Sequence, residues 1–154
     1  MPKPKVLILT GSKHDLELLK PTEEILKQFN IPYEIKVSSA HRNPGRTRKL
    51  ASQAEERGIR VIIAAAGMAA HLAGVIASLT TLPVIGIPLP GSYFKGIDSY
   101  LATLQMPVGT PVATVAVGSH GAKNAAILAA QILALSDHEL KKRLQRFKAE
   151  LAKK

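Results

Sequence analysis

The sequence predicts an α/β fold, a three-layer α/β/α sandwich around a five-stranded parallel sheet with one further helix at the C-terminus. Five short apolar runs alternate with helical patterns along the chain, which is typical of successive strand–helix–strand units. The first run, Val6–Leu9, is continuously apolar, as expected of a strand buried on both faces. The 154 residues, 46% of them hydrophobic, suffice for one domain with its own core.

Proline and glycine divide the first half of the chain into elements. A helical pattern follows Ser12, and Pro21 should kink or divide that helix because proline cannot donate a backbone hydrogen bond. Proline favours the first turn of a helix and glycine the position after its end, so Pro44 opens a second helix and Gly58 closes it. The predicted elements are a strand at Val6–Leu9, a helix to about Phe29, a strand at Tyr33–Ser38, a helix at Pro44–Arg57 and a strand at Arg60–Ala65.

The second half of the chain continues the alternation. Pro83 stops the helix before the fourth strand, and Asp98 lies in the first turn of the next helix, where the helix dipole favours a negative charge. The predicted elements are a helix from about Ala69 to Leu79, a strand at Val84–Ile87, a helix at Ile97–Gln105, a strand at Val112–Val117 and a helix at Ala122–Leu135. We expect the flavodoxin-like strand order 2-1-3-4-5.

The chain is basic, with 21 Lys and Arg against 11 Asp and Glu and a net charge of +10. Half of this excess lies in the last 17 residues, whose apolar positions follow the spacing of one helix stripe: Leu140, Leu144, Phe147 and Leu151. We predict a catalytic α/β domain at residues 1–136 and a basic amphipathic helix at 137–154 within the same domain. A nucleic-acid-binding arm is the alternative, but the interleaved aromatic residues of single-strand binders are missing, so we expect no nucleic-acid partner.

Composition also excludes several classes of protein. The absence of cysteine excludes disulfides, thiolate nucleophiles and cysteine metal sites. Val61–Leu79 has no formal charge and approaches the length of a membrane span, but it is alanine-rich and contains Gly67, His71 and Gly74. The N-terminus has no signal-peptide pattern. We therefore expect a cytoplasmic protein with no membrane partner.

Polar residues follow the predicted strands, and in open parallel sheets ligands bind beyond the carboxyl ends of the strands. A loop and helix N-terminus such as Gly11-Ser12 offers backbone N–H groups to an anion, and Ser39 with Arg42 adds a hydroxyl and a charge suited to phosphate. Asp15 can accept hydrogen bonds from ribose-like hydroxyls. His41 is the candidate proton carrier, because imidazole is the side chain that ordinarily titrates near neutral pH.

Simpler roles for these residues stay open, and other chemistries can be tested against the sequence. Ser12 and Asp15 could serve only as helix caps, and His41 could be a surface loop residue. The third strand ends in alanines rather than in the acid that a response regulator needs, and there is no Walker A sequence, nucleophile elbow or H-x-x-x-H pattern. Proton transfer on a small phosphorylated substrate is the chemistry that remains.

Five segments occur in a characteristic order: Gly11–Leu16, Ser38–Arg42, Ala66–Gly74, Gln105–Pro107 and Ala122–Ala126. Together they resemble the PurE family of N5-carboxyaminoimidazole ribonucleotide mutases, over about residues 5–136. The resemblance implies an isomerase of de novo purine biosynthesis that needs no cofactor and no metal. Its product would be 4-carboxy-5-aminoimidazole ribonucleotide, formed by release of CO₂, its retention in the pocket and its transfer to the ring carbon. A direct aminoimidazole ribonucleotide carboxylase and a non-catalytic nucleotide-binding module are the alternatives.

The resemblance also implies roles for individual residues and an assembly. His41 would be the general acid–base. The implied substrate-binding residues are Gly11, Ser12, Asp15, Ser39, Arg42, Ala66 and Gly67, and the supporting residues are His14, Met68 and His71. His14 stands where the family usually has serine, and Met68 where it usually has glycine. A homo-octamer with sites between subunits is implied, which would account for two helices, His71–Leu79 and Asn124–Leu135, that are apolar on nearly every side.

Overall fold

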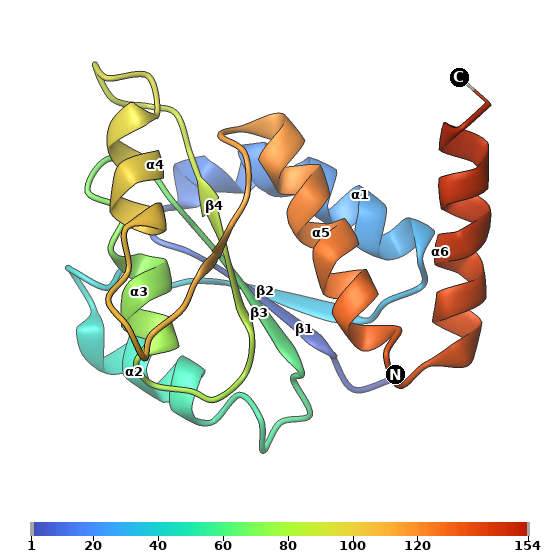
Figure 1. Cartoon of the computed structure of the whole chain (residues 1–154). Coiled ribbons are helices and arrows are strands. Elements are labelled where there is room, and N and C mark those ends of the chain that lie inside the picture. Colours follow the sequence, from blue (N-terminus) through green and yellow to red (C-terminus); the bar gives the residue numbers. More distant parts are fainter. Residues whose placement is uncertain (1, 154) are drawn as a thin grey trace.

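The chain is described by a computed structural model that covers residues 2–153. Its five-stranded, fully parallel sheet has the order β2-β1-β3-β4-β5, which confirms the predicted flavodoxin-like arrangement (Figure 1). The strands are β1 (Val6–Thr10), β2 (Tyr33–Val37), β3 (Val61–Ala66), β4 (Val84–Pro88) and β5 (Ala113–Thr114). The helices are η1 (a 3-10 helix, Lys13–Leu19), α1 (Lys20–Gln28), α2 (Pro44–Ser52), α3 (Leu72–Ala77), α4 (Ile97–Leu104), α5 (Ser119–Leu133) and α6 (His138–Leu151).

Parallel pairing brings the carboxyl ends of the strands to one edge of the sheet. Thr10 of β1 pairs with Val37 of β2 and Ala65 of β3, and Ala66 pairs with Pro88 of β4. The loops that follow these four strands therefore leave the sheet side by side. This is the edge at which the sequence predicts a ligand site.

Helices cover both faces of the sheet and separate the core into two clusters. On one face, β1 and β3 side chains such as Ile8 and Ile63 pack with Leu26 of α1 and the alanines of α5. On the other face, Leu7 and its neighbours pack against α2 and α3. Figure 1 shows α1 and α5 on one side of the sheet and α2, α3 and α4 on the other, so the fold has the three layers that were predicted.

The first helical region is divided where the sequence predicts it. Residues 13–19 form η1, and the regular α-helix α1 begins at Lys20 with Pro21 in its first turn. A proline in the first turn of a helix loses no intrahelical hydrogen bond, because the N–H groups there have no partner within the helix. Pro21 therefore begins α1 rather than bending a longer helix.

Helix α2 is shorter than predicted, because it ends at Ser52 and not at Arg57. The chain then turns through residues 53–58, and the N–H of Ile59 donates to the carbonyl of Ala54 at 3.1 Å. Both Ala54 and Ile59 are fully buried. Gly58 has φ of +94°, the left-handed conformation that closes the turn, so the predicted role of Gly58 in ending the segment holds although the helix has already ended.

The fifth strand is the second difference, because β5 covers only two residues instead of the predicted Val112–Val117. It lies at the edge of the sheet and pairs only with Ile85 and Gly86 of β4. Beyond β5 the chain keeps isolated contacts with β4, through the N–H of Val115 to Gly86 O and the N–H of Gly118 to Pro88 O. The segment follows β4 without forming a continuous ladder.

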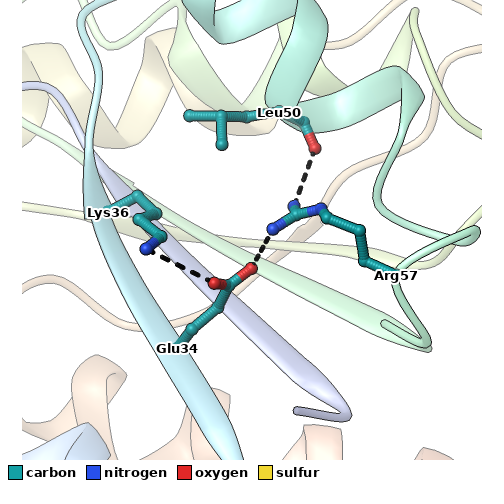
Figure 2. A network of polar contacts seen from close by, with 4 residues as sticks. All are labelled: Glu34, Lys36, Leu50 and Arg57. Atoms are coloured by element: carbon teal, nitrogen blue, oxygen red, sulfur yellow. Dashed lines mark hydrogen bonds and ion pairs between the residues drawn. The ribbon is translucent and has the colours of Figure 1, made fainter. Parts of the chain in front are cut away.

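The opposite edge strand, β2, is tied to the turn after α2 by a network of charged groups (Figure 2). The carboxylate of Glu34 lies between Arg57 and Lys36, with its second oxygen 3.5 Å from the Lys36 ammonium. The Arg57 guanidinium also donates to the carbonyl of Leu50 at 3.3 Å. Arg57 therefore joins the outermost strand to the last turn of α2.

The C-terminal helix α6 packs against the helices of one layer. Its residues Leu140 and Leu144 are buried, and Phe147 meets Phe29 edge to face at a centroid distance of 5.3 Å. Asp137 caps α6, and the hydrogen bond from the Leu140 N–H holds the pKa of the Asp137 carboxyl below its usual range. Lys154, the last residue of the predicted helix, lies outside the described residues. No helix within residues 2–153 is long and apolar enough to cross a bilayer.

Apolar surface is exposed on a different helix from the two that the sequence singles out. The apolar side chains of α5 are packed within its own chain, because α1, α6 and the sheet cover its alanines and Leu133. The buried residues of α3 are Leu72, Ala73 and Ile76. Large apolar side chains are exposed instead on α4 and the loops beside it, a group that we call the α4 face: Tyr93, Phe94, Ile97, Leu101, Leu104 and Val108.

Candidate active site

A cavity of about 640 Å³ lies at the carboxyl edge of the sheet. Loops after β1, β2, β3 and β4 line it. All the predicted site residues are brought together here: Gly11, Ser12, His14, Asp15, Ser39, His41, Arg42, Ala66, Gly67, Met68 and His71. Pro90 and Gly91 complete the wall from the loop after β4. Ser119 and His120, which follow the fifth strand along the chain, do not line this cavity.

The loops after β1 and β2 hold each other in position. The Ser12 hydroxyl accepts the N–H of His14 at 3.3 Å, and the Ser39 hydroxyl accepts the N–H of Arg42 at 3.2 Å. The Arg42 guanidinium crosses between the loops and donates to the carbonyl of Gly11 at 2.9 Å. A ligand anion would therefore meet hydroxyl, N–H and guanidinium groups that are already oriented.

Asp15 is held by a residue that sequence reasoning did not include. The hydroxyl of Thr10, the last residue of β1, donates to Oδ2 of Asp15 at 3.0 Å. Thr10 is itself fully buried. The Asp15 carboxylate is thereby anchored to the sheet by one oxygen. The signal in the sequence was a polar residue that ends an otherwise apolar strand.

His41 and His71 form a hydrogen-bonded pair in the cavity. The Nε2 atom of His41 lies 2.7 Å from Nδ1 of His71, and the two rings are nearly perpendicular at 87°. His41 comes from the loop after β2 and His71 from the residue before α3, so two loops meet in this contact. One nitrogen of the pair donates and the other accepts, so the contact couples the tautomers of the two rings.

The loop after β3 is narrow, and one residue in it is unusual. Ala66, Gly67 and Ala69 are small, and a Cβ on Gly67 would lie 3.4 Å from the carbonyl oxygen of Leu89. Met68 has φ of +55°, a left-handed conformation that costs a non-glycine residue about 1 kcal/mol. Its side chain is 64% exposed. The Met68 carbonyl accepts the N–H of Ala70 at 2.9 Å, which tightens the loop.

A second hollow of about 450 Å³ adjoins the first and shares several lining residues with it, among them Ser12, His14 and Arg42. Lys13, Arg42 and Arg46 contribute three cationic groups, and we call this hollow the cationic lobe. Among residues 2–153, those that line the lobe include no acid. Its charge favours an anion. Sequence reasoning missed Lys13 and Arg46, although Arg46 follows Arg42 at the spacing of one helical turn.

The described part of the chain, residues 2–153, contains no group of three or more His, Cys, Asp or Glu side chains that could hold a metal ion. The cavity itself presents several hydrogen-bond donors and acceptors. These are the histidine pair, the Asp15 carboxylate, the two serine hydroxyls and the cations of the lobe. Such a set can bind an anionic ligand and move a proton.

The open parallel sheet, with cationic groups and a histidine pair at its carboxyl edge, defines an α/β protein whose candidate ligand site is built from its strand-end loops. The chain belongs to the AIR carboxylase family, whose model matches residues 5–154. This match and the following ones confirm the family predicted from the sequence motifs.

Curated relatives of the chain are similar over nearly their whole lengths. It is 53% identical over 148 residues to the N5-carboxyaminoimidazole ribonucleotide mutase of Saccharolobus solfataricus, covering 96% of this chain and 92% of that protein. It is 51% identical to the protein of the same name from Thermotoga maritima, covering 96% and 85%. The crystal structure of Treponema denticola PurE has a TM-score of 0.88 at 31% identity, covering 97% of this chain and 92% of that one.

Proposed function

We propose that this protein is an isomerase that converts N5-carboxyaminoimidazole ribonucleotide to 4-carboxy-5-aminoimidazole ribonucleotide in de novo purine biosynthesis. The observation that carries this function is the match, at about half identity over nearly the whole chain, to curated relatives named as this mutase. The single cavity that gathers all the predicted site residues supports it.

The ribonucleotide would enter with its phosphate toward the cationic lobe. Ser12, Ser39 and Arg42 line both the lobe and the main cavity, so they suit the phosphate and its linkage to the ribose. Asp15 lines only the main cavity, where its carboxylate can accept ribose hydroxyls. The aminoimidazole would then lie between His41 and the small residues that begin the loop after β3.

His41 is the general acid–base in the proposed mechanism. The bond between the exocyclic nitrogen and the carboxylate carbon breaks, its electron pair stays on nitrogen, and His41 protonates that nitrogen as CO₂ forms. The ring carbon C4 then gives an electron pair to CO₂, and His41 takes the C4 proton, so the histidine ends as it began. His71 positions this ring through the 2.7 Å contact. The transferred carboxylate comes from the substrate itself, and the proton that His41 gives to the nitrogen is replaced by the proton from C4.

The decisive assay supplies N5-carboxyaminoimidazole ribonucleotide without added bicarbonate. Formation of the C4-carboxylated isomer is the expected result. The name of the family, AIR carboxylase, favours a second candidate, in which aminoimidazole ribonucleotide is carboxylated directly. Activity only with aminoimidazole ribonucleotide and CO₂ would move the assignment to that reaction. Binding of the ribonucleotide without either conversion would leave a nucleotide-binding module.

Arg46 tests the placement of the phosphate, and Arg48 is its matched control on the same helix. Arg46 lines the cationic lobe, whereas Arg48 is also exposed but lines neither hollow. We expect Arg46→Gln to raise KM about fivefold, the factor for about 1 kcal/mol between unit charges 4 Å apart in water, and to leave kcat unchanged. Arg48→Gln should change neither. Equal effects of the two substitutions in steady-state kinetics would contradict the placement.

We further propose that the protein is a homo-oligomer, an octamer as the resemblance implies. The α4 face supports this, because Ile97, Leu101 and Leu104 project along one side of α4 and are 65%, 54% and 43% exposed. Contiguous apolar surface of this kind marks an interaction site. We expect light scattering to give the mass of eight chains and Leu101→Glu to lower it. A monomeric wild-type protein would overturn the proposal.

A further inference from the structure

We propose that Met68 retains CO₂ at the reacting end of the cavity, as a residue that determines how faithfully the carboxylate is transferred. The proposal rests on the proposed mutase function. It concerns a residue for which the structure shows an unfavourable backbone conformation at the wall of the candidate site. Such outliers point to function when the surrounding structure maintains them.

The backbone of Met68 does not suit methionine. Its φ of +55° lies in the left-handed region, where glycine has no penalty and side chains with a Cβ are disfavoured. Two short hydrogen bonds maintain the turn, from Ala70 N–H to Met68 O at 2.9 Å and from His71 N–H to Ala69 O at 2.7 Å. The sequence therefore keeps a large side chain where glycine would relieve the backbone.

Packing in the core does not explain that side chain. Met68 is 64% exposed, whereas its neighbours Ala65 and Ala70 are buried. Methionine at the wall of a cavity brings a flexible and polarisable apolar surface that adapts to what lies beside it. The exposed surface of Met68 is available to a ligand.

The position of Met68 suits the neutral intermediate of the proposed reaction. Met68 lines the same cavity as His41 and lies three residues before His71 on one loop. The other residues of that loop, Ala66, Gly67, Ala69 and Ala70, leave room for the imidazole but offer little apolar surface. CO₂ is small, uncharged and no longer bonded to the substrate. An apolar side chain in the wall of the cavity that holds the histidine pair would hinder the exchange of CO₂ with solvent until C4 attacks.

Isotope exchange tests this role directly. Unlabelled N5-carboxyaminoimidazole ribonucleotide is converted in ¹³C-bicarbonate with carbonic anhydrase present. Mass spectrometry then measures the ¹³C incorporated into the product. A blank without the enzyme corrects for spontaneous loss of CO₂ from the substrate. For Met68→Gly we expect the ratio of labelled to unlabelled product to rise about fourfold over wild type, the factor for one methylene-sized apolar contact. The melting temperature should stay the same or rise, because glycine suits the backbone at this position.

Two further variants separate apolar surface from bulk. Met68→Leu should incorporate as little ¹³C into the product as the wild type does. Met68→Gln, of similar length but polar, should incorporate as much ¹³C as Met68→Gly. A glycine variant that releases decarboxylated ribonucleotide instead of product also supports the proposal.

Three outcomes would overturn the retention role: a glycine variant with wild-type label, a glycine variant that loses both decarboxylation and product formation, or a glutamine variant that retains CO₂ as well as methionine does. In each of these three outcomes the wild-type enzyme still converts the substrate. Failure of the wild type to convert the substrate would instead remove the proposed function, and the role of Met68 with it.

Discussion

Replacing His41 by asparagine is expected to lower kcat of the mutase reaction by about a hundred- to ten-thousand-fold, the usual contribution of a general acid–base. The proposed reaction needs one group that gives a proton to the departing nitrogen and later takes a proton from C4. Asparagine can donate a hydrogen bond but cannot exchange a proton near neutral pH. The measurement is the rate of C4-carboxylated product from N5-carboxyaminoimidazole ribonucleotide without bicarbonate.

Three variants make the His41 result interpretable. His41 is exposed, so its replacement should leave the free energy of unfolding nearly unchanged. His138→Asn, on α6 and away from the cavity, should retain full activity. His71→Leu removes the Nδ1 partner of His41, whereas His71→Asn keeps a hydrogen-bonding atom near it, so the leucine variant should lose more activity and show the larger change in pH profile. A His41→Asn enzyme with wild-type turnover would contradict the acid–base role.

Gly121→Ala is expected to destabilise the fold by about 3 kcal/mol or more, at or above the usual upper end for overpacking. A Cβ on Gly121 would overlap the carbonyl oxygen of Ala116 and would lie 2.6 Å from its carbonyl carbon. Both are backbone atoms, so no side-chain rotation can relieve the clash. Helix propensity alone would favour alanine over glycine by at most about 1 kcal/mol, so the clash decides the sign of the stability change. Urea unfolding followed by circular dichroism measures the change.

Gly45 provides the matched control, because it also lies in the first turn of a helix. A Cβ on Gly45 would meet nothing within 4 Å. Gly45→Ala should therefore be neutral or stabilise the protein by up to about 1 kcal/mol, chiefly by restricting the unfolded chain. If the two alanine variants unfolded at the same urea concentration, the close approach of Ala116 to α5 would be disproved.

Local signals predicted most of the fold. Apolar runs of strand length, separated by helical patterns, were enough for the five strands and their order, because a parallel sheet allows few ways to connect such units. Pro21 and Pro44 correctly predicted the division of the first helical region and the start of α2, because proline affects the backbone only within its own helical turn. The end of α2 at Ser52 was not predictable in this way. It depends on burying Ala54 and Ile59, a requirement that the helical pattern through Arg57 does not reveal.

The candidate site was predicted as a set of residues but not as a geometry. Every predicted residue lines one cavity because all follow strands that end at the same edge. The contact between His41 and His71 joins residues 30 positions apart, and Thr10 reaches Asp15 from inside the sheet. These contacts, like the location of Lys13 and Arg46 on a second hollow, depend on the paths of several loops at once.

The sequence by itself determined the fold class, the strand order, the family and the residues that gather at the strand ends, because periodicity, proline, glycine and motif order are properties of short segments. Only the tertiary structure decided which apolar helix is covered and which is exposed. The apolar side chains of α5 are covered by its own chain, whereas α4 leaves Ile97 and Leu101 exposed. The physical reason is that burial is set by neighbours distant in the sequence, and a segment's composition does not specify its neighbours.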